Sequence, residues 1–411
     1  GPGGTHNRWQ VPSEGGEDLG PHHTLHYKNQ MNALRPEDQV TVNRGDLTED
    51  GIAKVTLQAR SSVPDAPVGF TVNFGSNVNL NAQCRENDGL ENFYCPPGSN
   101  WQHYRFEVVD RVGNDSFVPG HGVLINASRN SGTPRVWMLD PNPQDIDMVD
   151  FYRPDGTPVM VVRGDPRQLN DATFHAGTNS GSEFEYVDET SRLHLYVLDT
   201  FRDDEGVLHY DVAARHLDGA GDFDRDVTVD APEVFTVGKQ TALVQLGVTN
   251  TGEAGEGLFD SDIYRVEASV DAAGWEVFQP YEVYAASAGE ALDAAVYVTR
   301  TSANASAGSL TVTVTSESDS SVSETVTVPL DASTVTLTAA SVGAVIDLYA
   351  DELGHANTTA LKARVRAFFA ARAGAARDRV LEQFEREIEQ IDDEVAYAAL
   401  RSIYETMRGV R

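Results

Sequence analysis

The chain has 411 residues, of which 63 are acidic and 31 are basic, so its formal net charge is -32. A surface this negative repels nucleic-acid phosphates and anionic lipid headgroups, and we expect neither as a partner. No run of about 18 apolar residues occurs in the sequence, which argues against a membrane-spanning helix.

The first part of the chain predicts a short helix followed by a β-sandwich. Residues 24–34 are predicted to form a helix, and this helix should stop at Arg35-Pro36, because proline ends a helix. From residue 41 to 232, short alternating runs separated by turns such as Pro154 to Thr157 predict antiparallel strands. These runs are 55–59, 70–74, 104–109, 122–127, 135–139, 158–162, 193–198 and 207–214.

The second part predicts a more regular sandwich and then helices. Residues 233–332 alternate Thr and Val with frequent turns, a pattern typical of an immunoglobulin-like sandwich, and Trp275 is expected in its core. Residues 333–411 have apolar residues at helical spacing, which predicts three or four amphipathic helices broken near Gly354 and Gly374. The predicted fold class is therefore mainly β, with two antiparallel β-sandwich domains followed by a small C-terminal helical bundle.

The two cysteines of the chain, Cys84 and Cys95, frame a polar loop. A disulfide between them would stabilise the fold by roughly 3 kcal/mol through loop entropy. It would also indicate an oxidising, extracellular compartment. Free thiols and metal ligation are the alternatives.

An acidic segment at residues 222–233 is the sharpest signal for a metal. Its carboxylates follow the spacing of a calcium-binding loop, and they belong to Asp222, Asp224, Asp226, Asp230 and Glu233. The position that needs Gly in such a loop is Val227, and Val227 to Val229 resembles a strand. The segment is either a calcium site or a solvated acidic linker. The acidic surplus of the whole chain likewise indicates either calcium binding or a high-salt habitat.

Two other groups of polar residues are candidates for a site. His22 and His26 stand four residues apart, a spacing that can hold zinc, and His23 lies beside them. Residues 167–198 place many polar side chains among strands, which costs free energy unless those groups are paired. We interpret this segment as a structural hydrogen-bond network between hairpins, with a ligand or calcium surface, or an acid/base cluster, as alternatives. Its polar members are Arg167, Asn170, Asp171, His175, Asn179, Glu183, Glu185 and Asp188.

Several phrases resemble the C-terminal portion of secreted zinc metallopeptidases of the immune inhibitor A type. They are GPGGTHNRWQVP with PHHTLHYKNQMNAL, then HYRFEVVDRVGNDSFVPGHGVLI, then DPNPQDIDMVDFYRPDG and RQLNDATFHAGTNSGSEFEY. In that family a helix closes the catalytic domain and a β-sandwich follows. The residues that match the sandwich pattern are Tyr104, Glu107, Gly113, Asp115, Ser116, Pro119, Gly122 and Val123 to Ile125. The zinc ligands and catalytic Glu of the family lie in an HExxH helix, and this sequence contains no HExxH, GxSxG or GxxxxGK[ST] motif.

The resemblance implies a division of the chain and a function. Residues 1–40 would be the end of a catalytic domain, 41–232 a disulfide-bearing sandwich, 233–332 an immunoglobulin-like module and 333–411 a helical module. The chain would be the non-catalytic C-terminal region of a secreted metallopeptidase, with zinc bound only elsewhere in the parent protein. Its domains would position the enzyme, as a monomer, on a protein or glycan substrate or surface. The alternatives are a non-enzymatic adhesive surface protein of a salt-loving organism and a viral envelope spike ectodomain.

Overall fold

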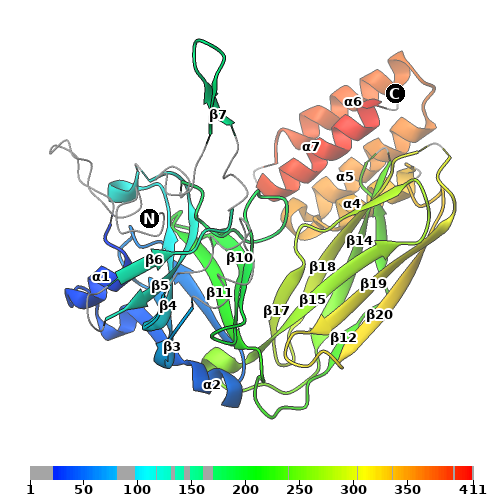
Figure 1. The fold of residues 1–411 in the computed structure, drawn as a ribbon. Coiled ribbons are helices and arrows are strands. Elements are labelled where there is room, and N and C mark those ends of the chain that lie inside the picture. Colours follow the sequence, from blue (N-terminus) through cyan, green and yellow to red (C-terminus); the bar gives the residue numbers. More distant parts are fainter. Residues whose placement is uncertain are drawn as a thin grey trace.

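The computed structural model of the chain is built mainly from β-strands, with a group of helices at the C-terminal end (Figure 1). This confirms the predicted fold class. The structure describes residues 22–80, 98–116, 118–130, 135–142, 149–160, 170–238, 240–302, 304–335, 337–391 and 394–409. Cys84, Cys95 and Arg167 lie outside the described residues.

The first sandwich consists of two sheets that pack face to face. Their strand orders are β1-β3-β4-β5-β6 and β2-β11-β10-β9. The strands are β1 (Gln39–Asn43), β2 (Ala53–Gln58), β3 (Gly69–Val78), β4 (Trp101–Val109), β5 (Gly122–Arg129), β6 (Arg135–Met138), β9 (Glu185–Asp188), β10 (Leu193–Arg202) and β11 (Leu208–His216). All pairs are antiparallel except β1 with β3, which run parallel. A parallel pair needs a crossover connection, and here the helix α2 (Arg44–Glu49) and strand β2 provide it.

Strand β4 shows how alternation builds both faces of this sandwich. Tyr104, Phe106 and Val108 point into the apolar core, so the residues between them face outward. Two of those outward residues, Arg105 and Glu107, are only 4% and 1% exposed. They are buried because the helix α1 (Leu25–Gln30) lies on the outer face of the sheet. The predicted helix at 24–34 is thus present but shorter at its C-terminal end.

A two-stranded hairpin projects from the first sandwich (Figure 1). It consists of β7 (Val149–Tyr152) and β8 (Pro158–Met160). Its turn is the predicted one, since Gly156 has a φ of 85° and its amide donates to the Arg153 carbonyl at 2.8 Å.

The second sandwich also has two antiparallel sheets. One has the order β12-β14-β18-β16, with β13 also pairing with β14, and the other is β17-β15-β19-β20. Trp275 is 8% exposed within the core, and its Nε1 donates to the Ser306 carbonyl at 2.9 Å, which confirms its predicted core position. The strands are β12 (Val227–Val229), β13 (Glu233–Thr236), β14 (Thr241–Asn250), β15 (Ser261–Val270), β16 (Trp275–Phe278), β17 (Val283–Ser287), β18 (Ala291–Arg300), β19 (Gly308–Ser316) and β20 (Ser323–Leu330).

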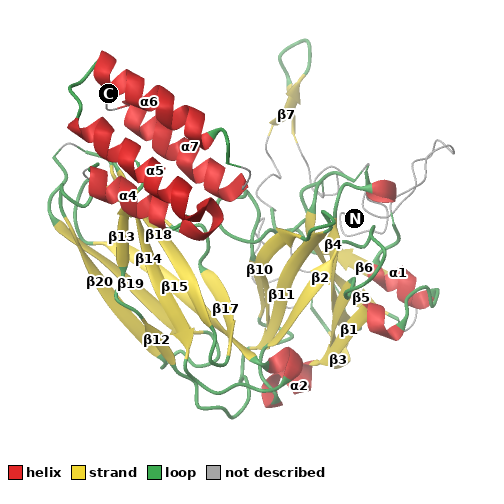
Figure 2. Cartoon of the chain, turned by 180° about the vertical axis from the view of Figure 1, so that it is seen from behind, coloured by secondary structure: helices red, strands yellow, loops and turns green. Residues whose placement is uncertain are grey.

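The C-terminal helices form a layer on one end of the second sandwich (Figure 2). They are α4 (Ala339–Asp347), α5 (Ala350–Ala370), α6 (Ala375–Ile388) and α7 (Glu394–Gly409). Phe235 of β13 is buried in the helical core together with Phe368 and Leu400. Gly354 has non-helical φ and ψ angles inside α5, and Gly374, at a φ of 88°, precedes α6, so both predicted breaks are confirmed. In the part of the chain that the structure describes, no helix has the length and hydropathy of a membrane span.

Candidate functional site

A buried arginine attaches α1 to the first sandwich. Arg60 donates from Nε to Asp115 at 2.9 Å and pairs through Nη1 with Glu107, and all three side chains are at most 1% exposed. Glu107 also accepts the backbone amide of Leu25 at 2.5 Å, and Asp115 accepts the backbone amide of His22 at 2.9 Å. One cation therefore sits between two carboxylates, and both carboxylates hold the backbone at the start of α1. We call Arg60, Glu107 and Asp115 the α1 anchor.

The electrostatics of the α1 anchor favour its charged form. Burial alone would lower the pKa of Arg60, but Glu107 and Asp115 more than offset it, so that pKa is raised. Burial and the nearby Arg60 lower the pKa of Lys28, whose Nζ lies 3.4 Å from the Arg60 carbonyl. Arg60 is thus the cation that pairs directly with both buried carboxylates, and Lys28 is a further cation close to them.

A second contact holds α1 through His26. Arg105 Nη1 lies 2.8 Å from His26 Nδ1, and arginine can only donate, so Nδ1 accepts and the ring proton is on Nε2. Burial, followed by the charge of Arg105, lowers the pKa of His26 to about 4, which keeps the ring neutral. His26 is fully buried, whereas His23 is exposed. The His22 and His26 pair is therefore used to dock the helix, with Nδ1 of His26 already engaged.

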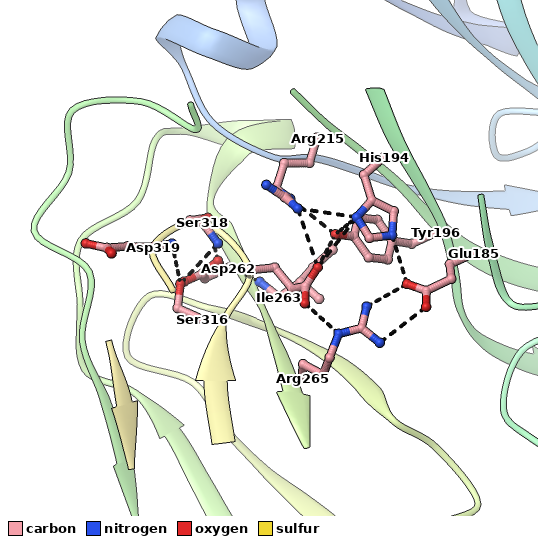
Figure 3. A network of polar contacts seen from close by, with 11 residues as sticks. Glu185, His194, Tyr196, Arg215, Asp262, Ile263, Arg265, Ser316, Ser318 and Asp319 are labelled. Atoms are coloured by element: carbon pink, nitrogen blue, oxygen red, sulfur yellow. Dashed lines mark hydrogen bonds and ion pairs between the residues drawn. The ribbon is translucent and has the colours of Figure 1, made fainter. Parts of the chain in front are cut away.

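A second polar cluster joins the two sandwiches (Figure 3). Arg265 of β15 donates to Glu185 of β9 from Nη2 at 2.6 Å and to Glu317 from Nε at 2.7 Å. Tyr196 of β10 donates to Glu317, and Arg215 of β11 donates to the Tyr196 hydroxyl at 3.2 Å. We call this cluster the inter-sandwich network; its members are Glu185, His194, Tyr196, Arg215, Arg265 and Glu317.

The two carboxylates of the inter-sandwich network are held ionised. Burial alone would raise the pKa of Glu185, but hydrogen bonds from His194 and Arg265 outweigh it and bring that pKa to about 2. Burial would likewise raise the pKa of Glu317, but hydrogen bonds from Arg265 and Tyr196 outweigh it, so that pKa is lowered. Two arginines therefore balance two carboxylates across the domain boundary.

The loop that carries Glu317 is fixed by a fully buried carboxylate. Asp262 accepts the hydroxyls of Ser316 at 2.5 Å and of Ser318 at 2.6 Å, and the Asp319 amide donates to Ser316 Oγ at 3.1 Å (Figure 3). The Glu317 amide donates to the Ile263 carbonyl at 2.7 Å. Glu317 is therefore held in place through its backbone as well as through its carboxylate.

Apolar and backbone contacts reinforce the boundary between the sandwiches. Ile52, Leu198 and Ile263 belong to a buried cluster drawn from both of them. Thr178 donates from its amide to the Pro280 carbonyl at 2.8 Å and from its hydroxyl to the Gln279 carbonyl. A Cβ at Gly177 would come within 2.7 Å of the Pro280 carbonyl oxygen, which explains the glycine at this close approach. The two sandwiches therefore have a fixed relative orientation.

The polar segment at 170–198 contributes mainly to structural networks. Glu185 belongs to the inter-sandwich network, and Asp188 accepts the Tyr104 hydroxyl at 2.6 Å inside the first sandwich. His175 lies 2.9 Å from the His121 carbonyl, and its pKa is lowered by burial. Asp171 and Glu183 have pKa values raised by burial. This agrees with the interpretation of the segment as a hydrogen-bond network, and it brings no nucleophile and base together among these described residues.

The residues of the predicted calcium loop lie on the linker and on β12 and β13. Asp222, Asp224, Asp226, Asp230 and Glu233 are all exposed. The Asp226 carboxylate accepts the Thr251 hydroxyl at 2.9 Å, and the strand expected at Val227 to Val229 is present as β12. Over the described ranges, no three His, Cys, Asp or Glu side chains are grouped so that they could hold a metal ion. The residues described thus do not offer a donor set for zinc, and the calcium site stays a prediction.

Three of the nine residues that build these two clusters were named from the sequence, and the other six were missed: Arg60, His194, Tyr196, Arg215, Arg265 and Glu317. Arg60, Arg265 and Glu317 carry no local signal, because each finds its partners across the fold. Glu107 and Asp115 stood within the phrase that resembles the metallopeptidases, so that phrase did mark part of the α1 anchor.

Comparisons with known proteins support the resemblance to metallopeptidases. Residues 30–217 match a family model described as "middle domain", and residues 231–332 match one described as "Peptidase M6-like domain". A protein of Arthroderma benhamiae, described as "Putative secreted metallopeptidase", is 37% identical over 319 residues, which cover 72% of this chain and 45% of that protein. The chain thus spans less than half the length of this relative. The chain also matches a solved structure of DesR, a β-glucosidase from Streptomyces venezuelae in complex with D-glucose. The match covers 26% of this chain and 15% of that chain at 21% identity, and its TM-score of 0.17 is too low to indicate a shared fold.

These matches confirm the resemblance at a coarse level. The immunoglobulin-like character of residues 233–332 and the kinship of the helical tail stay predictions. The secreted location predicted from the sequence is confirmed by the relation to a secreted protein. The chain is related to a secreted metallopeptidase, and it includes a region matched to an M6-like peptidase domain.

Proposed function

We propose that this chain is the non-catalytic C-terminal region of a secreted zinc metallopeptidase. It would hold and position a catalytic domain that lies in polypeptide outside these 411 residues and that binds the zinc. Two facts support this proposal: the matched relative is more than twice as long as the aligned part, and the sequence has no HExxH motif.

The α1 anchor is the observation that carries the proposal. In the resembling family a helix at this point closes the catalytic domain, and here the corresponding helix is bound to the sandwich by a desolvated arginine between two carboxylates. Removing one partner of such a buried set costs about 3–5 kcal/mol, because a buried charge is left uncompensated. A joint of this strength would fix the direction of whatever precedes α1.

The inter-sandwich network would fix the next boundary along the chain, between the two sandwiches, in the same way. Because the two sandwiches are joined by paired charges, an apolar cluster and backbone contacts, they would act as a single rigid arm. Such an arm would place the catalytic domain, as a monomer, at a fixed distance from a protein or glycan surface.

The test compares the 411-residue chain with a longer protein that covers the full length of the relative. We expect the longer protein to cleave casein, to lose that activity with a zinc chelator and to contain one zinc by elemental analysis. The 411-residue chain should neither cleave casein nor contain zinc. Chelator-sensitive cleavage by the 411-residue chain alone would overturn the proposal, as would a full-length protein without zinc or activity.

A variant tests the role of the α1 anchor. In the longer protein, Arg60→Met should lower kcat/KM for casein but leave kcat/KM for a short peptide nearly unchanged, since only a large substrate needs the arm. Equal losses for both substrates would show that the α1 anchor supports folding and not positioning.

A further inference from the structure

A cleft of about 420 Å³ lies between the two sandwiches, beside the inter-sandwich network but separate from it. Its first wall belongs to β2, β10 and β11, and its second wall belongs to β17, β18 and the residues before β17. The residues that decide its chemistry are Lys54, Leu198, Asp199 and Asp211 on one side and Tyr281, Tyr284 and Asp293 on the other.

The interior of the cleft is apolar and aromatic. Leu198 is 4% exposed and forms part of the buried cluster at the boundary. Tyr281 and Tyr284 are half-buried, with ring centroids 6.1 Å apart and ring planes inclined by 49°. Burial raises the pKa of Tyr281 and brings that of Tyr284 to about 12, so both hydroxyls stay neutral. The cleft is therefore lined by two half-buried aromatic rings that add no charge of their own.

The rim of the cleft has an excess of negative charge. Three carboxylates stand against one ammonium group, since Lys54 is the single basic residue that lines the cleft. Asp211 is already engaged by Lys54 at 3.8 Å and by the Thr56 hydroxyl at 2.5 Å. The exposed carboxylate of Asp293 forms no ion pair with the described residues. Asp199 accepts the Tyr281 hydroxyl at 3.4 Å, which brings a carboxylate next to an aromatic ring.

The walls of the cleft are fixed before any ligand arrives. β10 of the first wall carries a member of the inter-sandwich network, and so does β15, which pairs with β17 of the second wall. Thr178 also holds the Pro280 carbonyl next to Tyr281. A preformed site loses less conformational freedom on binding, which favours affinity for its ligand.

We propose that this cleft binds an arginine side chain presented by a peptide partner. The guanidinium would stack on the faces of Tyr281 and Tyr284, and its charge would be balanced by Asp199 and Asp293. The methylene stem would lie along the apolar interior at Leu198. Guanidinium groups combine planarity, weak hydration and attraction to aromatic faces, which suits this combination of rings and carboxylates. A neutral sugar could also stack on tyrosine, but it would leave the negative rim uncompensated.

The binding is a property of the two sandwiches and needs no catalytic domain, so the 411-residue chain is suited to the test. The probe is a fluorescein-labelled pentapeptide, Gly-Gly-Arg-Gly-Gly, acetylated and amidated at its ends. The matched probe has citrulline in place of arginine, which keeps the shape and removes the charge. Fluorescence anisotropy in 150 mM salt measures both, and circular dichroism verifies that each variant is folded.

We expect the arginine probe to bind and the citrulline probe to bind at least about tenfold more weakly, because the ring faces and the carboxylates both act on the positive charge. Tyr281→Ala should weaken binding of the arginine probe by between about threefold and thirtyfold. Tyr281→Phe, which keeps the ring, should preserve it.

Two variants compare the loss of a negative charge at the rim of the cleft with the same loss elsewhere on the surface. Asp293→Asn should weaken binding of the arginine probe severalfold. Glu382→Gln, which removes the same unit of charge from an exposed position on α6, should not. Equal effects of these two substitutions, equal affinity for citrulline, or binding of a neutral oligosaccharide without binding of the arginine probe would each overturn the proposal.

Discussion

The α1 anchor allows a sharp comparison between a buried and an exposed version of the same arrangement. Arg60 lies between Glu107 and Asp115, with all three side chains at most 1% exposed. Arg192 likewise pairs with Glu189 and Asp218, both at 2.5 Å, but those side chains are 41% to 65% exposed. The prediction concerns Arg60→Met and its surface counterpart Arg192→Met.

The expected magnitudes follow from burial. Arg60→Met removes the cation that pairs directly with two buried carboxylates, and breaking a buried pair in this way costs about 3–5 kcal/mol in the free energy of unfolding. Arg192→Met should cost far less, because solvent screens exposed ion pairs and their net contribution is small. The triple variant Arg60→Met/Glu107→Gln/Asp115→Asn removes the three charges of the α1 anchor together and should regain most of the loss, since Gln still accepts the Leu25 amide.

Urea unfolding followed by tryptophan fluorescence measures these differences, because Trp101 and Trp137 pack in the first sandwich. Limited trypsin digestion adds a local measurement. In Arg60→Met, cleavage after Lys28 of α1 should accelerate, since the backbone at the start of this helix loses its carboxylate acceptors. If Arg60→Met is no more destabilising than Arg192→Met, or if the triple variant is worse than the single one, the desolvation argument is wrong.

Three further predictions concern other parts of the chain. Glu185→Gln should lower the free energy of unfolding at pH 7 by up to roughly 3 kcal/mol, because the folded pKa of Glu185, about 2, lies below its ordinary value of 4.5. That stabilisation exists above pH 4.5 and disappears as the pH falls toward 2. Urea titrations should therefore show that the difference in the free energy of unfolding between the variant and wild type narrows across this window. A constant difference would contradict the ionisation of Glu185. If the acidic segment at 222–233 binds calcium, millimolar Ca²⁺ should raise the Tm after EDTA treatment, whereas a Tm that responds only to molar KCl would favour salt adaptation. Gly374→Ala should cost about 1–3 kcal/mol, because the glycine has a φ of 88° and a ψ of -145°, and an unchanged melting curve of the helical signal would refute this.

Much of the fold could be predicted because its signals are local. The runs at 104–109 and 193–198 alternate as strands do, and they form β4 and β10. The helix α2 was missed because its sequence, RGDLTE, has Leu47 as its one apolar residue and therefore shows no apolar period. Its start does carry a capping signal, since the Asn43 amide donates to Asp46 three residues later at 2.8 Å. Its presence turns the chain so that β1 and β3 run parallel, which alternation alone does not predict.

The candidate site was predicted only where polar residues crowd together in the sequence. Glu185 stood out because it lies in such a segment. Its partner Arg265 lies 80 residues further along, in a strand whose pattern is fully explained by packing. Glu317 follows in a serine-rich turn, 121 residues from the tyrosine that it binds. Contacts over these separations are set by the packing of one sandwich on another, which periodicity does not report.

The arginines buried inside this chain make its surface more negative. Arg60 and Arg265 each face two carboxylates within the fold, and Arg105 lies buried under α1. The 31 basic residues must supply these interior positions, so fewer of them remain to offset carboxylates at the surface. A basic peptide will therefore be attracted to most of the exterior, but this attraction is screened beyond about 8 Å at 0.15 M salt. Contacts with Tyr281 and Asp293 act at shorter range, so binding that survives added salt and still depends on Tyr281 belongs to the cleft and not to the net charge.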